Sequence, residues 1–500
     1  MDLSAPLSDF MASGGDQRQV ADPATGLTRY RTTLAPRIGI GLGSCTASWP
    51  GPRAWHAMER TLERWREAPD ALEVVAAEAL SVRLRLRAVL ELATSGNTVL
   101  LPSGTDAIYL VSALAMEGVA RVHHVVVGAS ELGGGTFPAS RGMAFSPRVP
   151  FPLPGGSPSA GEPVEGLYRR TSATPVYLRG ADGECLDIDV VDREVTEVAL
   201  RAAEDGSRVV VHLVAHSKTG LRAPSVEAMV ALRERLGDQL VVLVDAAQGR
   251  IAPSDARHAI EMGFMVLWTG SKFYSGPPFS AALLLPERFS ADPGALPAGI
   301  SQWLTAADLP TEWTEARASL RSPANPGLVL RWVGALAETE AYHAIPEDRR
   351  SRVYYTFAGA VQEVFGPSHR VVIDLPMAPQ HRLAAGLGAF PTVFGFRVHD
   401  DDGPLDATRL KRLHALLDTD LSYEGAALGG RFHLGQPVSL GPPGEGVEAV
   451  LRVALGARMV TDLAGEDDGG AAWLRLNLQA IRRKTEALID ADLLVDGGSE

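Results

Sequence analysis

Two apolar segments are each followed by a side chain that can take part in catalysis. Together these two side chains can hold an aldehyde cofactor and stabilise charge on its ring. Asp245 follows Leu240–Val244, and Lys272 follows Phe264–Trp268 among small and hydroxylated residues. A lysine amine forms a Schiff base with an aldehyde, and an aspartate carboxylate keeps a ring nitrogen protonated so that the ring withdraws electrons. Gln248, shortly after Asp245, can donate to a phenolic oxygen of the same ring. This set predicts an enzyme that uses pyridoxal phosphate.

A second group of residues predicts the site of the cofactor phosphate. Ser103, Gly104 and Thr105 follow a short apolar segment and open a segment with helical periodicity. The first turn of a helix presents free amide donors and the positive end of the helix dipole, and glycine lets an anion approach the backbone. Thr269 and Ser271, just before the lysine, can add hydroxyl donors to the same phosphate.

Apolar segments that alternate with helical segments must position these residues. The strand-like segments are apolar throughout, which is typical of a parallel sheet buried on both faces. The helices between them predict an α/β fold in which helices sandwich a mostly parallel sheet, with the ligand crevice at the carboxyl ends of the strands. The predicted strands are Val99–Leu101, Val122–Val127, Val209–Val214, Leu240–Val244 and Phe264–Trp268, and the predicted helices include Ala107–Glu117 and Ser225–Leu236.

The order of these patterns divides the chain into three parts. Residues 1–95 are expected to form an N-terminal arm and helices that pack with the small domain, residues 96–310 the large cofactor-binding domain, and residues 311–500 a smaller α+β domain. Residues 1–35 are polar and predict an irregular or partly ordered arm. Residues 145–174 are rich in Pro, Gly and Ser and predict an ordered excursion or a lid.

Composition argues against several classes of protein. The 500 residues are 46% hydrophobic and 21% charged, as in globular enzymes, and the net charge of −13 gives no support for a nucleic-acid or anionic-membrane partner. The chain has two cysteines, no signal-peptide pattern and no apolar run long enough to cross a bilayer, so we expect a cytoplasmic protein. No spacing of histidines or cysteines is typical of a metal site.

The ordered series of motifs resembles the fold-type-I pyridoxal phosphate enzymes. Within them it is most similar to the class V aminotransferase group, which includes cysteine desulfurases and kynureninases. The resemblance covers Val99–Leu285 and is carried by Ser103-Gly-Thr, Asp245-Ala-Ala-Gln and Thr269-Gly-Ser-Lys. It implies a large α/β domain, a smaller domain and pyridoxal phosphate as the cofactor.

The resemblance also implies a role for each motif residue. Lys272 resembles the lysine that forms the Schiff base, Asp245 the partner of the pyridine nitrogen and Gln248 the contact of the phenolic oxygen. Ser271 stands where family members usually carry a histidine. The residues that resemble phosphate ligands are Gly104, Thr105, Thr269 and Ser271.

Two further family positions lie outside those motifs. Ser217 and Thr219 resemble the loop that approaches the ring, and either is expected to contact it. Fold-type-I enzymes commonly bind the substrate carboxylate with a C-terminal arginine, and Arg452 matches that position by order and by its strand-like flanks. A guanidinium fork suits a carboxylate. Arg431 and Arg397 are alternatives for this role, and an exposed strand arginine is the alternative for Arg452.

Three positions are less closely defined by the family pattern. Cys45 lies in a segment that can line the substrate entrance, although a small buried hydrophobe is the other interpretation. The aromatic residue that stacks on the ring is expected within Glu131–Phe137, but the sequence does not single it out. The resemblance implies a homodimer, and Arg321–Asn325 is a candidate for a loop that crosses between the subunits.

The predicted function is that of a pyridoxal phosphate enzyme acting on an amino acid or related amine, a small-molecule substrate, through Lys272, with an aminotransferase as the first choice. A lyase that eliminates a β-substituent or carboxylate, or an enzyme that forms carbon bonds, is the alternative. A protein of this fold that binds without turnover is a third interpretation. A desulfurase is disfavoured, because neither Cys45 nor Cys185 lies in the C-terminal half, where such an enzyme carries its nucleophile.

Overall fold

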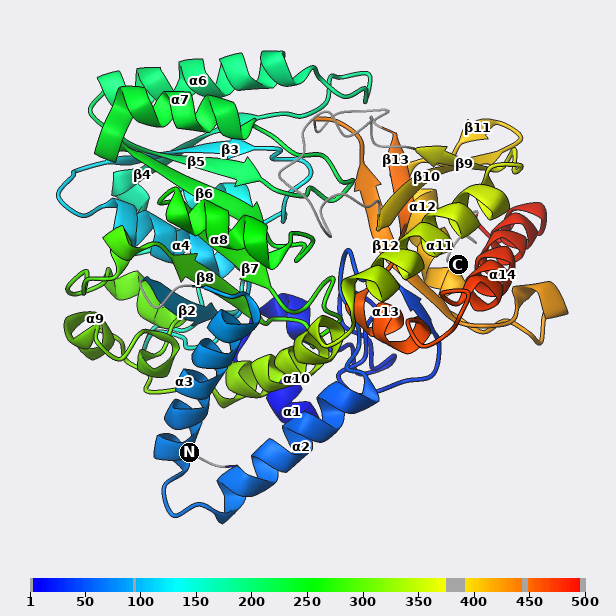
Figure 1. Ribbon diagram of the computed structural model, residues 1–500, viewed down its shortest axis with the longest axis horizontal. Helices are drawn as coiled ribbons and strands as arrows, with labels where there is room; N and C mark the ends of the chain where they lie inside the picture. The colour runs from blue at the N-terminus through cyan, green and yellow to red at the C-terminus, as the bar shows by residue number, and fades with distance from the viewer. Residues whose placement is uncertain (1–2, 93–95, 375–391, 443–447, 495–500) are drawn as a thin grey trace.

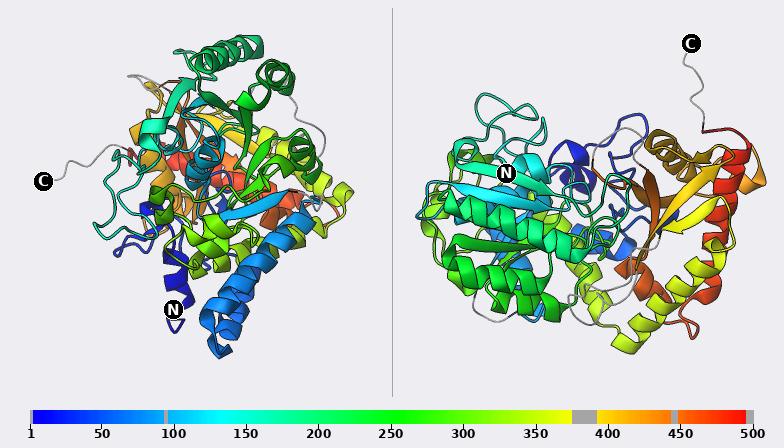
Figure 2. Two further views of the ribbon diagram at one scale, coloured as in Figure 1. Left: turned by 90° about the vertical axis from the view of Figure 1, so that its left-hand side faces the viewer. Right: turned by 90° about the horizontal axis from the view of Figure 1, so that it is seen from above.

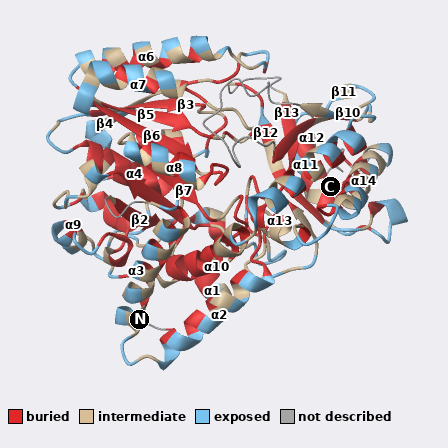
Figure 3. Cartoon of the chain, viewed as in Figure 1, coloured by how far each residue is buried: buried red, intermediate tan, exposed pale blue. Residues whose placement is uncertain are grey.

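The computed structural model describes residues 3–92, 96–374, 392–442 and 448–494. Its strands form one sheet of seven strands and one of six, and in Figure 1 helix α10 (Pro326–His343) lies below the two sheets and between them. The central strands of both sheets are buried, and exposed residues gather on the outer sides of the helices (Figure 3). The core therefore follows the two sheets.

The seven-stranded sheet has the order β2-β8-β7-β6-β5-β3-β4. Its described strands run parallel except β8, which is antiparallel to both of its neighbours. The predicted α/β architecture with a mostly parallel sheet is confirmed, whereas β8 was not predicted. The strands are β2 (Asn97–Leu101), β3 (Val122–Val127), β4 (Thr171–Val176), β5 (Arg208–Val214), β6 (Leu240–Ala246), β7 (Met265–Thr269) and β8 (Ala281–Leu285).

Side chains of these strands alternate between two cores, which is why their apolar runs are continuous. In β7, Val266 and Trp268 pack with one core, while Met265 and Leu267 pack with the other. The first core contains residues of α6 (Ile188–Glu204), α7 (Val226–Leu236) and α8 (Pro253–Glu261), and the second contains residues of α4 (Gly104–Ala115) and α5 (Thr136–Ser140). Helices therefore cover both faces of the sheet.

The six-stranded sheet combines distant parts of the chain. Its first strand, β1, comes from the N-terminal region and pairs in parallel with β12, with Ile40 opposite Phe432. The strands are β1 (Ile40–Leu42), β9 (Val371–Asp374), β10 (Val393–Asp400), β11 (Gly403–Pro404), β12 (Phe432–Ser439) and β13 (Ala449–Ala454). The helices that follow in this half are α11 (Glu347–Phe365), α12 (Ala407–Leu417), α13 (Ala457–Leu463) and α14 (Ala471–Asp490).

The N-terminal arm is more ordered than its sequence predicts. It contains α1 (Leu7–Ala12), and the buried guanidinium of Arg331 on α10 donates to the backbone carbonyls of Phe10, Ser13 and Gly14 at 3.2, 2.6 and 3.2 Å. The blue N-terminal segment thus lies between the two halves of the molecule (Figure 2, right). The helices that follow are α2 (Pro52–Glu67) and α3 (Ala71–Val89), and both pack against α10.

Part of the predicted excursion at 145–174 belongs to the sheet. β4 begins at Thr171 and is the edge strand, where Pro175 is tolerated because no further strand needs its missing N–H. The short helix α9 (Thr314–Ala318) precedes α10. Among the helices of the described residues, none combines the length and the apolar character needed to cross a membrane.

Candidate active site

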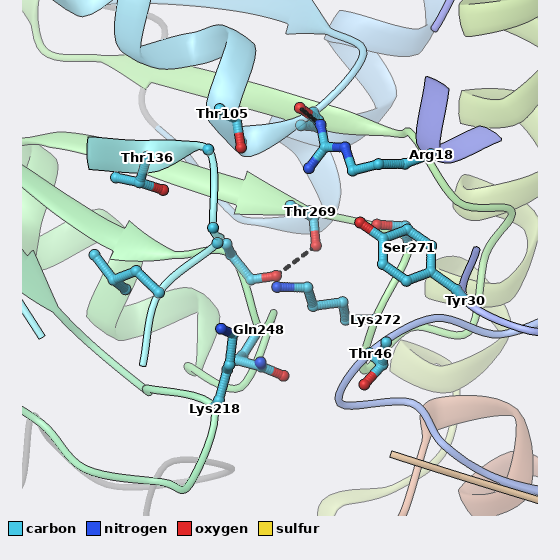
Figure 4. A pocket seen from close by; sticks show the side chains of 18 of the residues that line it. Arg18, Tyr30, Thr46, Thr105, Thr136, Lys218, Gln248, Thr269, Ser271 and Lys272 are labelled. Atoms are coloured by element: carbon cyan, nitrogen blue, oxygen red, sulfur yellow. Dashed lines mark hydrogen bonds between the residues drawn. The ribbon is translucent and has the colours of Figure 1, made fainter. Parts of the chain in front are cut away.

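A cavity of about 500 Å³ lies between the carboxyl ends of β6 and β7, the N-terminus of α4 and the second sheet. Figure 4 shows labelled side chains of α4, of β7, of the segments that follow β6 and β7, and of the N-terminal region around Lys272. The predicted site residues that line it are Cys45, Ser103, Gly104, Thr105, Asp245, Gln248, Thr269, Ser271, Lys272 and Arg452.

Lys272 and Asp245 reach this cavity from neighbouring strands. β6 and β7 pair in parallel, with Asp245 opposite Leu267, and Lys272 follows the end of β7. Burial lowers the pKa of Lys272 to about 8 against the opposing effect of Asp245, and burial raises the pKa of Asp245. Asp245 accepts a hydrogen bond from the backbone N–H of Ala247 at 3.0 Å. No ion pair joins the two side chains in the described structure, and both line the cavity.

The loop after β7 holds Lys272 in a defined position. The backbone N–H of Phe273 donates to the carbonyl of Gln248 at 3.2 Å, which ties this loop to the segment after β6. Gly276 packs on α10 so closely that a Cβ there would lie 2.6 Å from the Cβ of Ala335. Only glycine fits at this contact. The loop that carries Lys272 therefore packs closely against the buried helix α10.

The start of α4 has the features of an anion site. Ser103 caps the helix, accepting from the backbone N–H of Asp106 at 3.4 Å. The hydroxyls of Thr105 and Ser271 line the cavity, and no hydrogen-bond partner for them is found in the described part of the chain. Thr269 differs, because its hydroxyl hydrogen is already engaged with the carbonyl of Ala247 at 2.7 Å.

Arg18 is a cavity residue that the sequence interpretation missed. Its Nη2 donates to Ser103 Oγ at 2.9 Å, and its guanidinium forms an ion pair with Asp16 at 2.5 Å. Burial lowers the pKa of Arg18, but Tyr30 and Asp16 outweigh it and hold that pKa above its ordinary value. Nearby, burial and Asp16 raise the pKa of Asp106 to about 7. No local sequence pattern marks Arg18, because only the folded arm brings it to α4.

Gln248 and Cys45 are joined at the wall of the cavity. Gln248 Nε2 donates to the carbonyl of Cys45 at 3.1 Å, and Gln248 Oε1 accepts from Arg250 Nη1 at 3.0 Å. Cys45 lines the cavity but is 2% exposed, and its side chain packs with Val393 and Ala454. Its position therefore agrees with both interpretations, a residue near the substrate and a small buried hydrophobe.

Ser217 and Thr219 do not face the cavity as predicted. Both hydroxyls donate to the buried carboxylate of Glu131, from Ser217 at 2.5 Å. The neighbouring side chains His216 and Lys218 line the cavity instead. The chain bends and turns at these residues, so the two hydroxyls bind Glu131 and hold the loop while His216 and Lys218 contact the cavity.

Burial lowers the pKa of Lys218 to about 8 and holds the pKa of His216 well below its ordinary value. His216 is therefore neutral at pH 7, and Lys218 is largely a cation. Lys218 was not among the predicted site residues. Its only sequence signal was its place in the Ser217-Lys-Thr-Gly loop.

Arg452 extends from β13 into the cavity and is 2% exposed. Its Nη1 donates to the carbonyl of Lys218 at 2.9 Å, and its Nη2 donates to the carbonyl of Gln436 at 2.8 Å and to Thr46 Oγ1 at 3.0 Å. The alternative Arg397 instead forms ion pairs with carboxylates outside the cavity. Of the three arginines considered for the substrate carboxylate, Arg452 is the one that lines the cavity.

The segment expected to hold the ring-stacking aromatic residue places other groups at the cavity. Leu132, the glycines 133–135 and Thr136 line it, whereas Phe137 does not. The candidate intersubunit loop ends at Asn325, which caps α10 and donates to the carbonyl of Gly14 at 3.0 Å. Among the described residues, no group of three or more His, Cys, Asp or Glu side chains is placed to hold a metal ion.

Comparisons with known proteins show which solved structures have a similar fold. No family model matches the sequence, and no curated protein matches it. Similar solved structures include a cysteine desulfurase from Thermococcus onnurineus NA1, which has a TM-score of 0.50 and 13% identity over 89% of this chain and 95% of its own. TDC from Oryza sativa, solved with pyridoxal phosphate, has a TM-score of 0.51 and 14% identity over 90% of this chain and 83% of its own.

A third structure, SPT (serine palmitoyltransferase) with pyridoxal phosphate, has a TM-score of 0.51 and 14% identity. The match covers 98% of this chain and 94% of that one, so the likeness includes both sheets. These proteins carry out different reactions on a shared architecture. The chain has the fold of the fold-type-I pyridoxal phosphate enzymes.

Proposed function

We propose that this protein is a pyridoxal phosphate enzyme that acts on an amino acid or a related amine. The observation that carries the proposal is the juxtaposition of Lys272, Asp245 and the N-terminus of α4 at one cavity. A fold alone does not define an activity, whereas an amine of lowered pKa beside a buried carboxylate and an anion site is a set with a specific use.

The residues present fit this cofactor. Lys272 offers an amine with a pKa of about 8, and Asp245 offers a buried carboxylate without an ion-pair partner among the described residues. Thr105, Ser271 and Arg18 offer a hydroxyl pair and a cation for the phosphate at the start of α4. When bound, pyridoxal phosphate supplies an aldehyde that condenses with amines and a ring that withdraws electrons from the substrate α-carbon.

The chain's own groups then have distinct tasks. Asp245 keeps a proton at the ring nitrogen. The protonated nitrogen would be a cation next to the buried carboxylate of Asp245, and this cation favours the ionised form of that carboxylate. Lys272, once its amine is free, takes a proton from the substrate α-carbon, and a pKa near the working pH suits this transfer. Arg452 binds the substrate carboxylate through the second N–H of Nη1, the one for which the described residues offer no acceptor. Gln248 holds the phenolic edge of the ring.

Transamination remains the first reaction to test, with elimination, decarboxylation or carbon-bond formation as alternatives. The choice depends on whether the proton taken by Lys272 is returned to the cofactor or whether another bond of the substrate breaks. A cytoplasmic location and a homodimer stay predictions; light scattering of the purified protein measures the second. The presence of both Lys272 and Asp245 disfavours a protein that binds without turnover.

The decisive experiment is reduction of the protein–cofactor bond with borohydride, followed by peptide mapping. The other lysines are Lys218, Lys411 and Lys484, so the expected result is a cofactor adduct on the Lys272 peptide alone. An absorption band at roughly 410–430 nm should accompany it. Both signals should vanish in Lys272→Ala and persist in Lys411→Ala, the control at an exposed lysine. An adduct that persists in Lys272→Ala would refute the proposal.

A panel of amino acids then separates the reactions. Formation of the amine form of the cofactor together with a keto acid supports transamination. Release of a product from the side chain or of carbon dioxide, with the original absorption band restored, supports a lyase.

A further inference from the structure

The cavity contains more positive than negative side chains. Those lining it among the described residues include the cations Arg18, Arg29, Lys218, Lys272 and Arg452, but the carboxylates Asp245 and Glu131 alone. Charges in a partly desolvated site are costly unless they are compensated. The excess of positive side chains therefore indicates that the ligand is negatively charged. This inference rests on the proposed function, which assigns part of the excess to the cofactor.

Most of these charges have a defined counterpart. Glu131 is paired with Arg179, whose Nε donates to Oε1 at 2.8 Å. Arg18 is paired with Asp16 at the start of α4, and Arg29 is exposed at the mouth of the cavity. Lys272 and Asp245 serve the aldehyde and the ring nitrogen of the cofactor. Two cations are left, and both are at the end of the cavity formed with the second sheet: Lys218 and Arg452.

These two cations are neighbours. Arg452 Nη1 donates to the carbonyl of Lys218, and each hydrogen-bond acceptor of Arg452 in the described structure is neutral. The charges that act on Lys218 are those of Arg452, Lys272 and Glu131, whereas those that act on Arg18 come from Tyr30, Asp16 and Asp106. In Figure 4, Lys218 lies on the opposite side of Lys272 from Arg18 and Thr105, so the cavity has two cationic ends and Lys218 is at the end away from the phosphate site.

The backbone of Lys218 is held on both sides. Its N–H donates to the carbonyl of Glu131 at 3.1 Å, and its carbonyl accepts from Arg452 at 2.9 Å. Ser217 and Thr219 fix the flanking residues through the carboxylate of Glu131. The ammonium group itself has no hydrogen-bond or ion-pair partner within the described ranges. A loop fastened at three successive residues therefore presents one free cation to the cavity.

We infer that the amino substrate carries a second anionic group on its side chain, which Lys218 binds while Arg452 binds the α-carboxylate. A single carboxylate on Arg452 would leave Lys218 uncompensated beside another cation. A substrate with two anionic groups neutralises both, and the fixed loop sets the distance between them. A carboxylate, a sulfonate or a phosphate shares this chemistry.

Amine-free analogues test this inference without any reaction at the cofactor. Isothermal titration calorimetry of the protein with added pyridoxal phosphate compares succinate with succinamate, which has the same shape but one negative charge fewer. 3-Sulfopropanoate and 3-phosphonopropanoate distinguish the three sources of the second anion. We expect the best dianion to bind about tenfold more tightly than succinamate.

Substitutions connect that preference to one residue. In Lys218→Met the preference for the dianion should fall to within about twofold, with succinamate binding unchanged. Lys218→Arg should retain most of the preference, which excludes a general loss of structure, and Lys411→Met removes a surface lysine as the matched control. Equal affinity for succinate and succinamate in the unaltered protein, no detectable dianion binding, or an equal loss for both ligands in Lys218→Met would overturn the inference.

The outcomes also separate this inference from the proposed function. A cofactor adduct on Lys272 without a dianion preference would refute the second anion site alone. A dianion preference that depends on Lys218, without an adduct on Lys272, would refute the proposed function and leave the anion site standing.

Discussion

Arg452 Nη1 donates a 2.9 Å hydrogen bond to the backbone carbonyl of Lys218, although 234 positions of sequence separate the two residues. The bond joins β13 of the second sheet to the loop after β5 of the first. The end of the cavity that we propose to receive the substrate is therefore assembled from both halves of the chain, and each half contributes one cation to it.

Arg452→Gln is expected to weaken the binding of succinamate and of succinate by about tenfold or more, because both share the carboxylate that the guanidinium holds. This result differs from that of Lys218→Met, which should affect the dianion alone. Calorimetry measures both, and Arg397→Gln, an arginine outside the cavity, is the control. Unchanged succinamate binding in Arg452→Gln would argue against this role.

Arg18→Gln is expected to raise the dissociation constant for pyridoxal phosphate by about tenfold, because it removes a cation that lies at the N-terminus of α4. Pyridoxal, which has no phosphate, should bind equally well to the variant and to the unaltered protein. Titration of absorbance with each compound gives both constants. If affinity for both compounds falls alike, Arg18 maintains the cavity rather than the phosphate site.

Lys272→Met is expected to stabilise the cofactor-free protein at neutral pH, because it removes a buried cation needed for function rather than for folding. The pKa of Lys272 in the folded protein, about 8, lies below its ordinary value of 10.5. Between these two pH values the unfolded chain binds more protons than the folded protein, so the stability of the unaltered protein rises with pH. The advantage of the variant should therefore shrink across this window.

Urea denaturation at about pH 7, 8.5 and 10 measures this difference. Lys411→Met provides the comparison for loss of an exposed lysine. An advantage of Lys272→Met that stays constant over the three pH values would contradict the assignment of a buried, titrating amine.

Glu131→Gln is expected to destabilise the protein by about 3 kcal/mol, because the carboxylate is the buried partner of Arg179. It also accepts from Ser217 and Thr219, so the loop that carries Lys218 should loosen. Urea denaturation gives the stability, and the ratio of succinate to succinamate affinity reports on the loop. The double variant Glu131→Gln with Arg179→Met should recover part of the stability, since no unpaired cation remains buried.

Local patterns were sufficient for much of the first sheet. β3 spans Val122–Val127 as predicted, and α7 begins after a Ser225 cap whose side chain accepts from Ala228 N–H at 3.0 Å. Apolar runs and helix caps act over a few residues, so they are readable without knowledge of the fold. β4 was missed because Pro175 and the polar residues of an edge strand resemble a loop.

The sequence by itself determined that Lys272 and Asp245 lie at one cavity, because each follows or ends a strand that its own residues specify, and parallel strands bring their carboxyl ends to one edge. The tertiary structure alone decided which other side chains join them. Arg18 reaches α4 because Arg331 holds the arm, and Lys218 rather than Ser217 faces the cavity because Glu131 binds the hydroxyls on either side. Such choices depend on hydrogen bonds between residues far apart in the chain, and no local pattern encodes them.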